Sequence, residues 1–156
     1  MKQFTHLGSA GNVTMVDVSK KPATSRKACA TGFVRMPKTV VKKLKQKAIP
    51  KGDVLTLAQI AGIVGAKRTA ELIPLCHPIG LDHVEVTFKV LADGVRVTAT
   101  TRTRYATGVE MEAMTAVSVA SLAIYDMVKS VTRDVTITEI ELLEKSGGRS
   151  GHWRKR

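Results

Sequence analysis

The sequence predicts a single α+β domain, in which an antiparallel sheet carries helices packed on one face. Residues 84–90 alternate between apolar and polar side chains, which is typical of a half-buried strand. Asp93-Gly94 follows, and this dipeptide favours a tight hairpin turn. Other segments carry apolar residues at helical spacing. The predicted order is strand, helix, helix, hairpin, helix, strand, which favours the α+β class.

The first three predicted elements occupy residues 25–64. Residues 25–36 alternate loosely and predict a strand. Pro37 suits the first turn of a helix, whose apolar stripe consists of Val40, Val41, Leu44 and Ile49. Asp53 can cap the next helix. The apolar face expected for that helix consists of Val54, Leu57, Ala58, Ala61 and Val64.

The second half of the chain predicts a hairpin, a long helix and a last strand. Residues 84–90 and 95–104 form the hairpin, and residues 135–143 form the last strand. The helix covers residues 109–128, and its inward face is expected to contain Ala113, Ala116, Val117, Ala120, Ala123, Ile124 and Met127. Residues 1–156 are predicted to form a single domain. Its two ends, at about residues 1–21 and 146–156, contain glycines and show little apolar periodicity, so they are predicted to be flexible.

The composition favours a globular cytoplasmic protein. Apolar residues make up 44% of the 156, which is enough for a core. The sequence analysis expects no bilayer-spanning run and no secretion signal. Cys29 and Cys76 are expected to be reduced thiols. We expect no metal site, because the four histidines have no ligand spacing and no C-x-x-C occurs.

The net charge of +12 is the unusual property of the composition. It favours an anionic partner, either nucleic acid or a small phosphorylated molecule. Aromatic residues are only 4% of the chain, and no nucleic-acid-reading motif is present. The alternative of a basic nucleic-acid-binding module predicts tight, steeply salt-dependent binding. A structural partner in a cofactor-assembly complex is a further alternative, and it predicts that the purified protein alone forms no product.

Two polar segments are candidates for chemistry. Lys51-Gly52-Asp53 precedes the second helix, and Lys67 lies near its end, where it can also simply complement the helix dipole. Pro74 and Pro78 restrict the loop that contains His77, a residue suited to acid or base work near neutrality. The alternative is a buried loop histidine without a catalytic role.

The long helix carries the third candidate group. Asp126 and Lys129 are neighbours on one helix edge. Glu112 and Asp126 point the same way, since fourteen residues leave them only about 40° apart around the axis. They are also separated by roughly 21 Å along that axis. Either one of the two is structural, or two copies of the chain share each site.

The sequence resembles the molybdenum cofactor biosynthesis protein C family, the cyclic pyranopterin monophosphate synthases. The resemblance covers nearly the whole chain, in order. It is carried by residues 15–19, 51–53, 60–63, 66–69, 72–78, 107–113, 124–127 and 145–148. The resemblance implies a ferredoxin-like fold and a homohexamer, a trimer of dimers with sites between subunits. The implied enzyme is a phosphorus–oxygen lyase that converts 3′,8-cyclo-7,8-dihydroguanosine 5′-triphosphate to cyclic pyranopterin monophosphate and diphosphate.

The resemblance also implies roles for individual residues. The catalytic residues would be Asp126, Lys51, Lys129 and His77. The substrate-binding residues would be Leu75, Cys76, His77, Met111, Glu112, Lys67 and Lys145. The chain needs no cofactor of its own, although Mg²⁺ can accompany the triphosphate. Which lysine acts as acid or base stays open.

Overall fold

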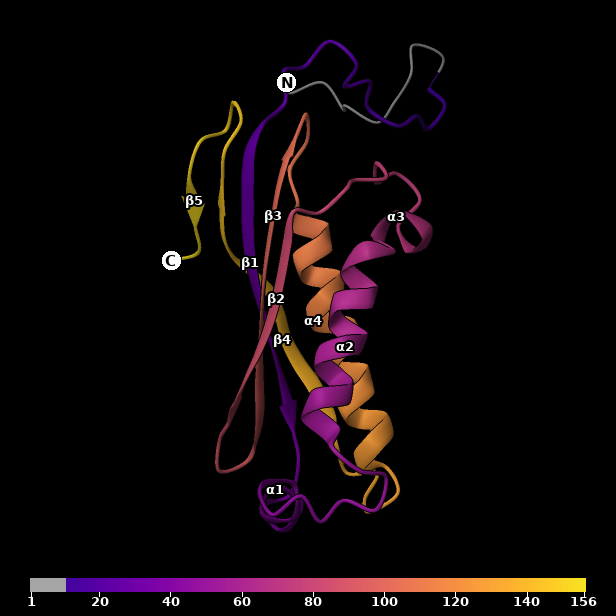
Figure 1. Cartoon of the computed structure of the whole chain (residues 1–156), viewed down its shortest axis with the longest axis vertical. Coiled ribbons are helices and arrows are strands. Elements are labelled where there is room, and N and C mark those ends of the chain that lie inside the picture. The colour runs from indigo at the N-terminus through magenta and orange to yellow at the C-terminus, as the bar shows by residue number, and fades with distance from the viewer. Residues whose placement is uncertain (1–10) are drawn as a thin grey trace.

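A five-stranded antiparallel sheet carries two long helices on one face (Figure 1). The computed structural model describes residues 11–156. The strand order is β2-β3-β1-β4-β5, and every neighbouring pair is antiparallel. The elements are β1 (Thr24–Arg35), α1 (Lys38–Lys45), α2 (Val54–Lys67), α3 (Thr69–Leu72), β2 (His83–Val90), β3 (Gly94–Tyr105), α4 (Glu110–Val128), β4 (Thr136–Ser146) and β5 (Trp153–Arg154). The predicted α+β, ferredoxin-like class is confirmed.

The core lies between the sheet and the two helices α2 and α4. Alternate residues of β1, among them Ala28, Ala30 and Val34, are completely buried, as strand periodicity requires. The expected inward face of α4 is confirmed, with Ala123 packed at its margin. Small buried side chains are present on both layers, among them Ala28 and Ala30 on β1 and Ala113, Ala116 and Ala120 on α4.

The expected apolar face of α2 is wrong in part. Leu57 and Val64 are 45% and 43% exposed, and Ile60 is 56% exposed. The face that packs on α4 is instead made of small residues, since Gly62 and Gly65 are buried. A Cβ on Gly62 would lie 2.9 Å from the Ala116 carbonyl oxygen. Close approach of the two helix backbones therefore decided the orientation of α2, and it turned the larger apolar side chains outward.

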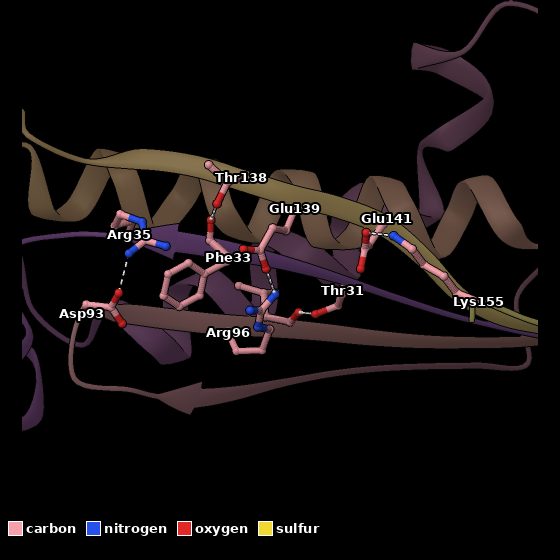
Figure 2. A network of polar contacts seen from close by, with 10 residues as sticks. Thr31, Phe33, Arg35, Asp93, Arg96, Thr138, Glu139, Glu141 and Lys155 are labelled. Carbon is pink, nitrogen blue, oxygen red and sulfur yellow. Dashed lines mark hydrogen bonds and ion pairs between the residues drawn. The ribbon is translucent and has the colours of Figure 1, made fainter.

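A bulge in β4 changes which side chains face the helices. Glu139 has a φ of 54°, and the register between β1 and β4 shifts nearby. Ile137 and Leu142 both pack on the core although they are five residues apart, which strict alternation does not allow. The side chain of the bulge residue Glu139 accepts a hydrogen bond from Arg96 at 2.5 Å (Figure 2).

The outer face of the sheet buries one aromatic ring under two cations. Phe33 is only 3% exposed, and the guanidinium carbons of Arg35 and Arg96 lie 5.1 and 4.8 Å from its ring centroid. Figure 2 shows this group with the Arg35–Asp93 ion pair beside it. The ring is thus part of the fold and is not available as a stacking platform.

The two ends of the chain differ from each other. Residues 1–10, part of the predicted flexible start, lie outside the described residues, and residues 14–23 form no helix or strand. Residues 146–156 were predicted to be flexible, with no helix or strand, whereas they contain β5, which pairs with β4. Helix α3 was also not predicted, because four residues carry no periodic signal.

Within residues 11–156, α4 is the one helix long and apolar enough to cross a membrane by length and composition. The sequence was expected to contain no bilayer-spanning run. About 56% of the apolar stretch of α4 is buried against the rest of the chain. Burial of this kind is typical of the core helix of a globular domain.

Candidate active site

A cavity of about 430 Å³ opens at the N-terminal end of α4. The loop after α3 brings Leu75, Cys76 and His77 to this cavity, and the first turn of α4 brings Met111 and Glu112. Five of the residues predicted to bind substrate therefore converge here. Apolar and polar groups are mixed in the lining, which suits a flat, heteroatom-rich ring.

The His77 side chain is held in place by the segment before β1. Its Nε2 lies 2.8 Å from the carbonyl oxygen of Val16, across 61 residues of sequence. The preceding turn is fixed by a 3.0 Å bond from the Cys76 amide to the Ile73 carbonyl. A bonded Nε2 leaves Nδ1 as the nitrogen available for other partners.

Glu112 is a carboxyl group inside the protein. It is only 4% exposed, and no ion pair to it is present among the described residues. Burial raises the pKa of Glu112, and the nearby Glu110 raises it further. Burial also raises the pKa of the Cys76 thiol, with an added contribution from Glu112. Proton-bearing groups are thus favoured at this wall of the cavity.

A second cavity, of about 570 Å³, adjoins the first and is strongly cationic. The two cavities share Lys21, Thr107, Gly108 and Glu110 as lining residues. The cations that line the second cavity are Lys20, Lys21, Arg26, Lys27, Lys145 and Arg149. Glu110 is the one carboxylate among its lining residues. An anionic group is the ligand that such a lining favours.

Only Lys145 among these cations was predicted from the sequence. Lys20, Lys21, Arg26, Lys27 and Arg149 lie in segments without helical or strand periodicity or on the end of β1, so that no pattern joined them. One signal was present in the glycine pair after Lys145. A Cβ on Gly148 would lie 1.6 Å from an Arg26 guanidinium nitrogen, and Gly148 has a φ of 70°. A side chain at Gly148 would displace the Arg26 guanidinium from its position, and the positive φ favours glycine there.

Arg26 and Lys145 are oriented by neighbouring groups. The Arg26 Nε and Nη2 atoms each donate to a carbonyl oxygen at 3.3 Å, that of Tyr105 and that of Ala106. Lys145 has 18% of its side chain accessible, and its Nζ lies 3.9 Å from Glu110. These contacts orient two of the cations that line the second cavity.

Lys51, Asp126 and Lys129 form a separate cluster at the C-terminal end of α4. Lys51 Nζ donates to the Asp126 carboxylate at 3.1 Å and to its backbone carbonyl at 2.9 Å. Lys129 Nζ lies 2.6 Å from the other carboxylate oxygen. Hydrogen bonds from Lys129 and then Lys51 lower the pKa of Asp126, so this carboxylate stays ionised well into acid.

This cluster does not reach either cavity of its own chain. Asp126 lies fourteen residues along α4 from Glu112, a distance of roughly 21 Å in a regular helix. The geometric conflict found in the sequence is therefore present in the fold. Two groups of candidate residues occupy opposite ends of one helix.

Lys67 lies at a third position, behind Glu112. It lines a cavity of about 310 Å³, together with Pro78, Ile79 and Glu112. Glu112 lines both this cavity and the first. Lys67 thus approaches the site from the side of α2, separated from the cationic cavity.

The two cysteines are free thiols, half-buried and apart. In the part of the chain that the structure describes, no group of three or more His, Cys, Asp or Glu side chains has an arrangement that could hold a metal ion. Proton transfer and charge stabilisation are the chemistry that the lining side chains themselves can supply.

Comparison with known proteins shows the family of the chain. Residues 15–148 match the MoaC family. The chain is 53% identical over 153 residues to the cyclic pyranopterin monophosphate synthase of Corynebacterium glutamicum (strain R), covering 98% of each protein. It is 50% identical to the synthase of Streptomyces coelicolor, covering 98% of this chain and 90% of the relative. It is 55% identical to cyclic pyranopterin monophosphate synthase 1 of Mycobacterium tuberculosis, with 97% and 90% covered. The chain belongs to the MoaC family.

Proposed function

We propose that this protein is a cyclic pyranopterin monophosphate synthase of molybdenum cofactor biosynthesis. It converts 3′,8-cyclo-7,8-dihydroguanosine 5′-triphosphate to cyclic pyranopterin monophosphate and releases diphosphate. The observation that carries the proposal is the pair of adjoining cavities, one lined by His77 and Glu112 and the other by cations. Relatives of this chain over nearly their full length bear that enzyme name.

The cationic cavity would bind the triphosphate. Lys21, Arg26 and Lys145 surround it from three different segments, so a chain of phosphates can be contacted on several sides. Charge-assisted bonds to phosphate oxygens are stronger than neutral ones. The same cations would stabilise charge on diphosphate as it leaves.

The first cavity would bind the purine-derived base. Leu75 and Met111 offer apolar contact, and His77, Cys76 and Glu112 offer groups that can donate a hydrogen bond. Opening and reclosing rings requires protons to move between heteroatoms. A carboxyl whose pKa is raised and an imidazole suit that work.

Asp126, Lys51 and Lys129 would complete the site from another subunit. In one chain they lie at the C-terminal end of α4, far from the cavities. Asp126 has 53% of its side chain exposed, so it is accessible to a partner subunit. Large apolar side chains on the helical layer point to solvent in the single chain: Leu57, Ile60, Val64 and Leu122. Exposed apolar residues of this number favour association. We therefore propose a homohexamer, a trimer of dimers with sites between subunits.

Cofactors, partners and localisation follow from the proposed reaction. The reaction as written needs no redox group, so the chain needs no cofactor of its own, and Mg²⁺ would accompany the triphosphate as its counter-ion. The substrate is a small nucleotide, and neither nucleic acid nor a membrane is a partner. The protein would act in the cytoplasm, where nucleotide triphosphates are made.

Turnover by the purified protein tests the proposal. We expect incubation with the cyclised dihydro-GTP to release diphosphate and to give a pterin that fluoresces after oxidation. Asp126→Asn should lower the rate at least about a hundredfold, because it removes the charge that orients two lysines. The thermal midpoint of this variant should change little, because Asp126 is exposed. A parent protein without product, or an Asp126→Asn protein with parental turnover, would contradict the proposal.

A further inference from the structure

The last eight residues of the chain contain the two-residue strand β5 and lie outside the part matched by the family. The match ends at residue 148. After it the chain reverses, and β5 pairs with β4 at the edge of the sheet (Figure 1). The Lys155 amide donates to the Leu143 carbonyl at 2.8 Å. The Lys155 side chain pairs with Glu141, as Figure 2 shows.

The reversal is built from glycines and is positioned over the cationic cavity. Gly147, Gly148 and Gly151 all have positive φ, between 60° and 98°, so a side chain at any of them would strain the turn. The turn presents Arg149 and Ser150 as lining residues of the cavity. Ser150 also accepts a hydrogen bond from Lys145.

The contacts that hold this segment are few and exposed. β5 has two residues, and the ion pairs Lys155–Glu141 and His152–Glu144 are at the surface, where such pairs contribute little. Chain ends held in this way are the parts of a protein that open most readily. A ligand in the cavity would add contacts to Arg149 and Ser150 and would favour the closed position.

We propose that residues 149–156 form a strap that closes over the anionic end of the ligand and supplies Arg149 to a polyphosphate. Its anchor is the pairing of β5 with β4. Arg149 is then a binding residue, and Lys155 is a positioning residue that acts through the anchor. This inference rests on the proposed function for the identity of the ligand, and on the cavity alone for its anionic nature.

Binding of inorganic tripolyphosphate, measured by calorimetry at low salt on the full chain, tests the strap. Arg149→Gln should weaken binding about tenfold, since it removes one charge-assisted contact. Lys155→Pro removes the amide that bonds Leu143 and the pair with Glu141, and it leaves Arg149 intact. We expect it to weaken binding about three- to tenfold, because the strap is released.

Arg156→Pro is the matched control, because it loses the same charge and adds the same residue one position after Lys155, outside the residues that bond to β4. It should bind tripolyphosphate as the parent does. In turnover, Arg149→Gln and Lys155→Pro should raise KM and leave kcat near the parental value. A merely structural role would lower both kcat and the thermal midpoint.

The outcomes separate this inference from the proposed function. Parental binding by Arg149→Gln, or equal binding by Lys155→Pro and Arg156→Pro, overturns the strap even if the parent forms the pterin product. No tripolyphosphate binding by the parent also overturns it. Should the parent form no product while the variants show the expected order of affinities, the proposed function fails and the strap is supported.

Discussion

At the scale of single residues, the candidate site residues include two carboxyl groups in different environments. Glu112 is buried and has no counter-ion among residues 11–156, whereas Asp126 is exposed between two lysines. Burial raises the pKa of the first, and hydrogen bonds lower the pKa of the second. One carboxyl is thus disposed to hold a proton and the other to remain an anion, and this difference suits an acid and a charged partner in one reaction.

Replacing Glu112 by glutamine should stabilise the fold at neutral pH. Because the pKa of Glu112 in the folded chain is raised above its ordinary 4.5, the ionised form costs stability at high pH. The parent therefore loses stability as pH rises above about 4.5. We expect Glu112→Gln to gain about 1 kcal/mol at pH 8, roughly 3 °C in Tm, and nothing at pH 4. Thermal unfolding at equal protein concentration measures both values.

Glu85→Gln is the control for that experiment, because Glu85 is exposed on β2. It should leave Tm within about 1 °C of the parent at either pH. A pH-independent gain for Glu112→Gln would mean that the charge of Glu112 carries no cost. Its turnover should fall regardless, since the side chain lines the proposed base cavity.

At the scale of elements, the contact of α2 with α4 positions the two ends of the site. α2 carries Lys51 just before its start and Lys67 at its end. Lys51 meets Asp126 at one end of α4, and Lys67 lies behind Glu112 at the other. The distance between the two backbones is set by Gly62 and Gly65, which lie against Ala116, Ala120 and Val119.

Gly62→Ala tests this contact. In an isolated helix the change would add about 1 kcal/mol of stability. Here the new methyl would lie 2.9 Å from the Ala116 carbonyl oxygen, a backbone atom that cannot move alone. We expect a net loss of about 1–3 kcal/mol in the free energy of unfolding, as for an overpacked core. Denaturant unfolding measures it.

Gly80→Ala provides the comparison, since no atom lies within 4 Å of the position of its added Cβ. Its free energy of unfolding should stay within about 0.5 kcal/mol of the parent. If Gly62→Ala were the more stable of the two, the close contact of α2 with α4 would not be what holds the helices in place.

At the scale of the whole molecule, the question is how the two ends of α4 serve one reaction. His77 lies at one end and Asp126 at the other, and a single small substrate cannot contact both within one chain. Two-fold association makes equivalent surfaces meet, so each site could combine the first end of one copy with the second end of its partner.

Mixing two inactive variants tests this arrangement. His77→Ala and Asp126→Asn should each be nearly inactive alone. If each site draws on two chains, mixed dimers hold one intact site and one doubly altered site. Random assembly from equal amounts should then recover about one quarter of parental turnover. The measurement is product formation after joint refolding or co-expression.

A mixture of Lys51→Ala and Asp126→Asn is the control, because both residues belong to the same cluster. Every site in this mixture carries one of the two changes, so no activity should return. If the mixture of His77→Ala and Asp126→Asn also stays inactive, while its assembled state matches that of the parent, sites shared between subunits are ruled out.

The sequence by itself determined the class of the fold, and it predicted five of the residues that line the first cavity. Alternation in β2, the Asp93-Gly94 turn and the apolar face of α4 are local patterns, and each acts over a few residues. The loop holding Leu75, Cys76 and His77 and the first turn of α4 could be joined because the family resemblance connected them. Their convergence on one cavity agrees with that expectation.

Only the tertiary structure decided the orientation of α2, the register of β4, and the cationic cavity. Leu57 and Val64 turned outward because backbone contact at Gly62 was closer than large side chains allow. Lys21, Arg26 and Arg149 are distant in sequence and share no periodicity, so nothing local relates them. Long-range packing brought them together, so the high local density of positive charge exists only in the folded chain.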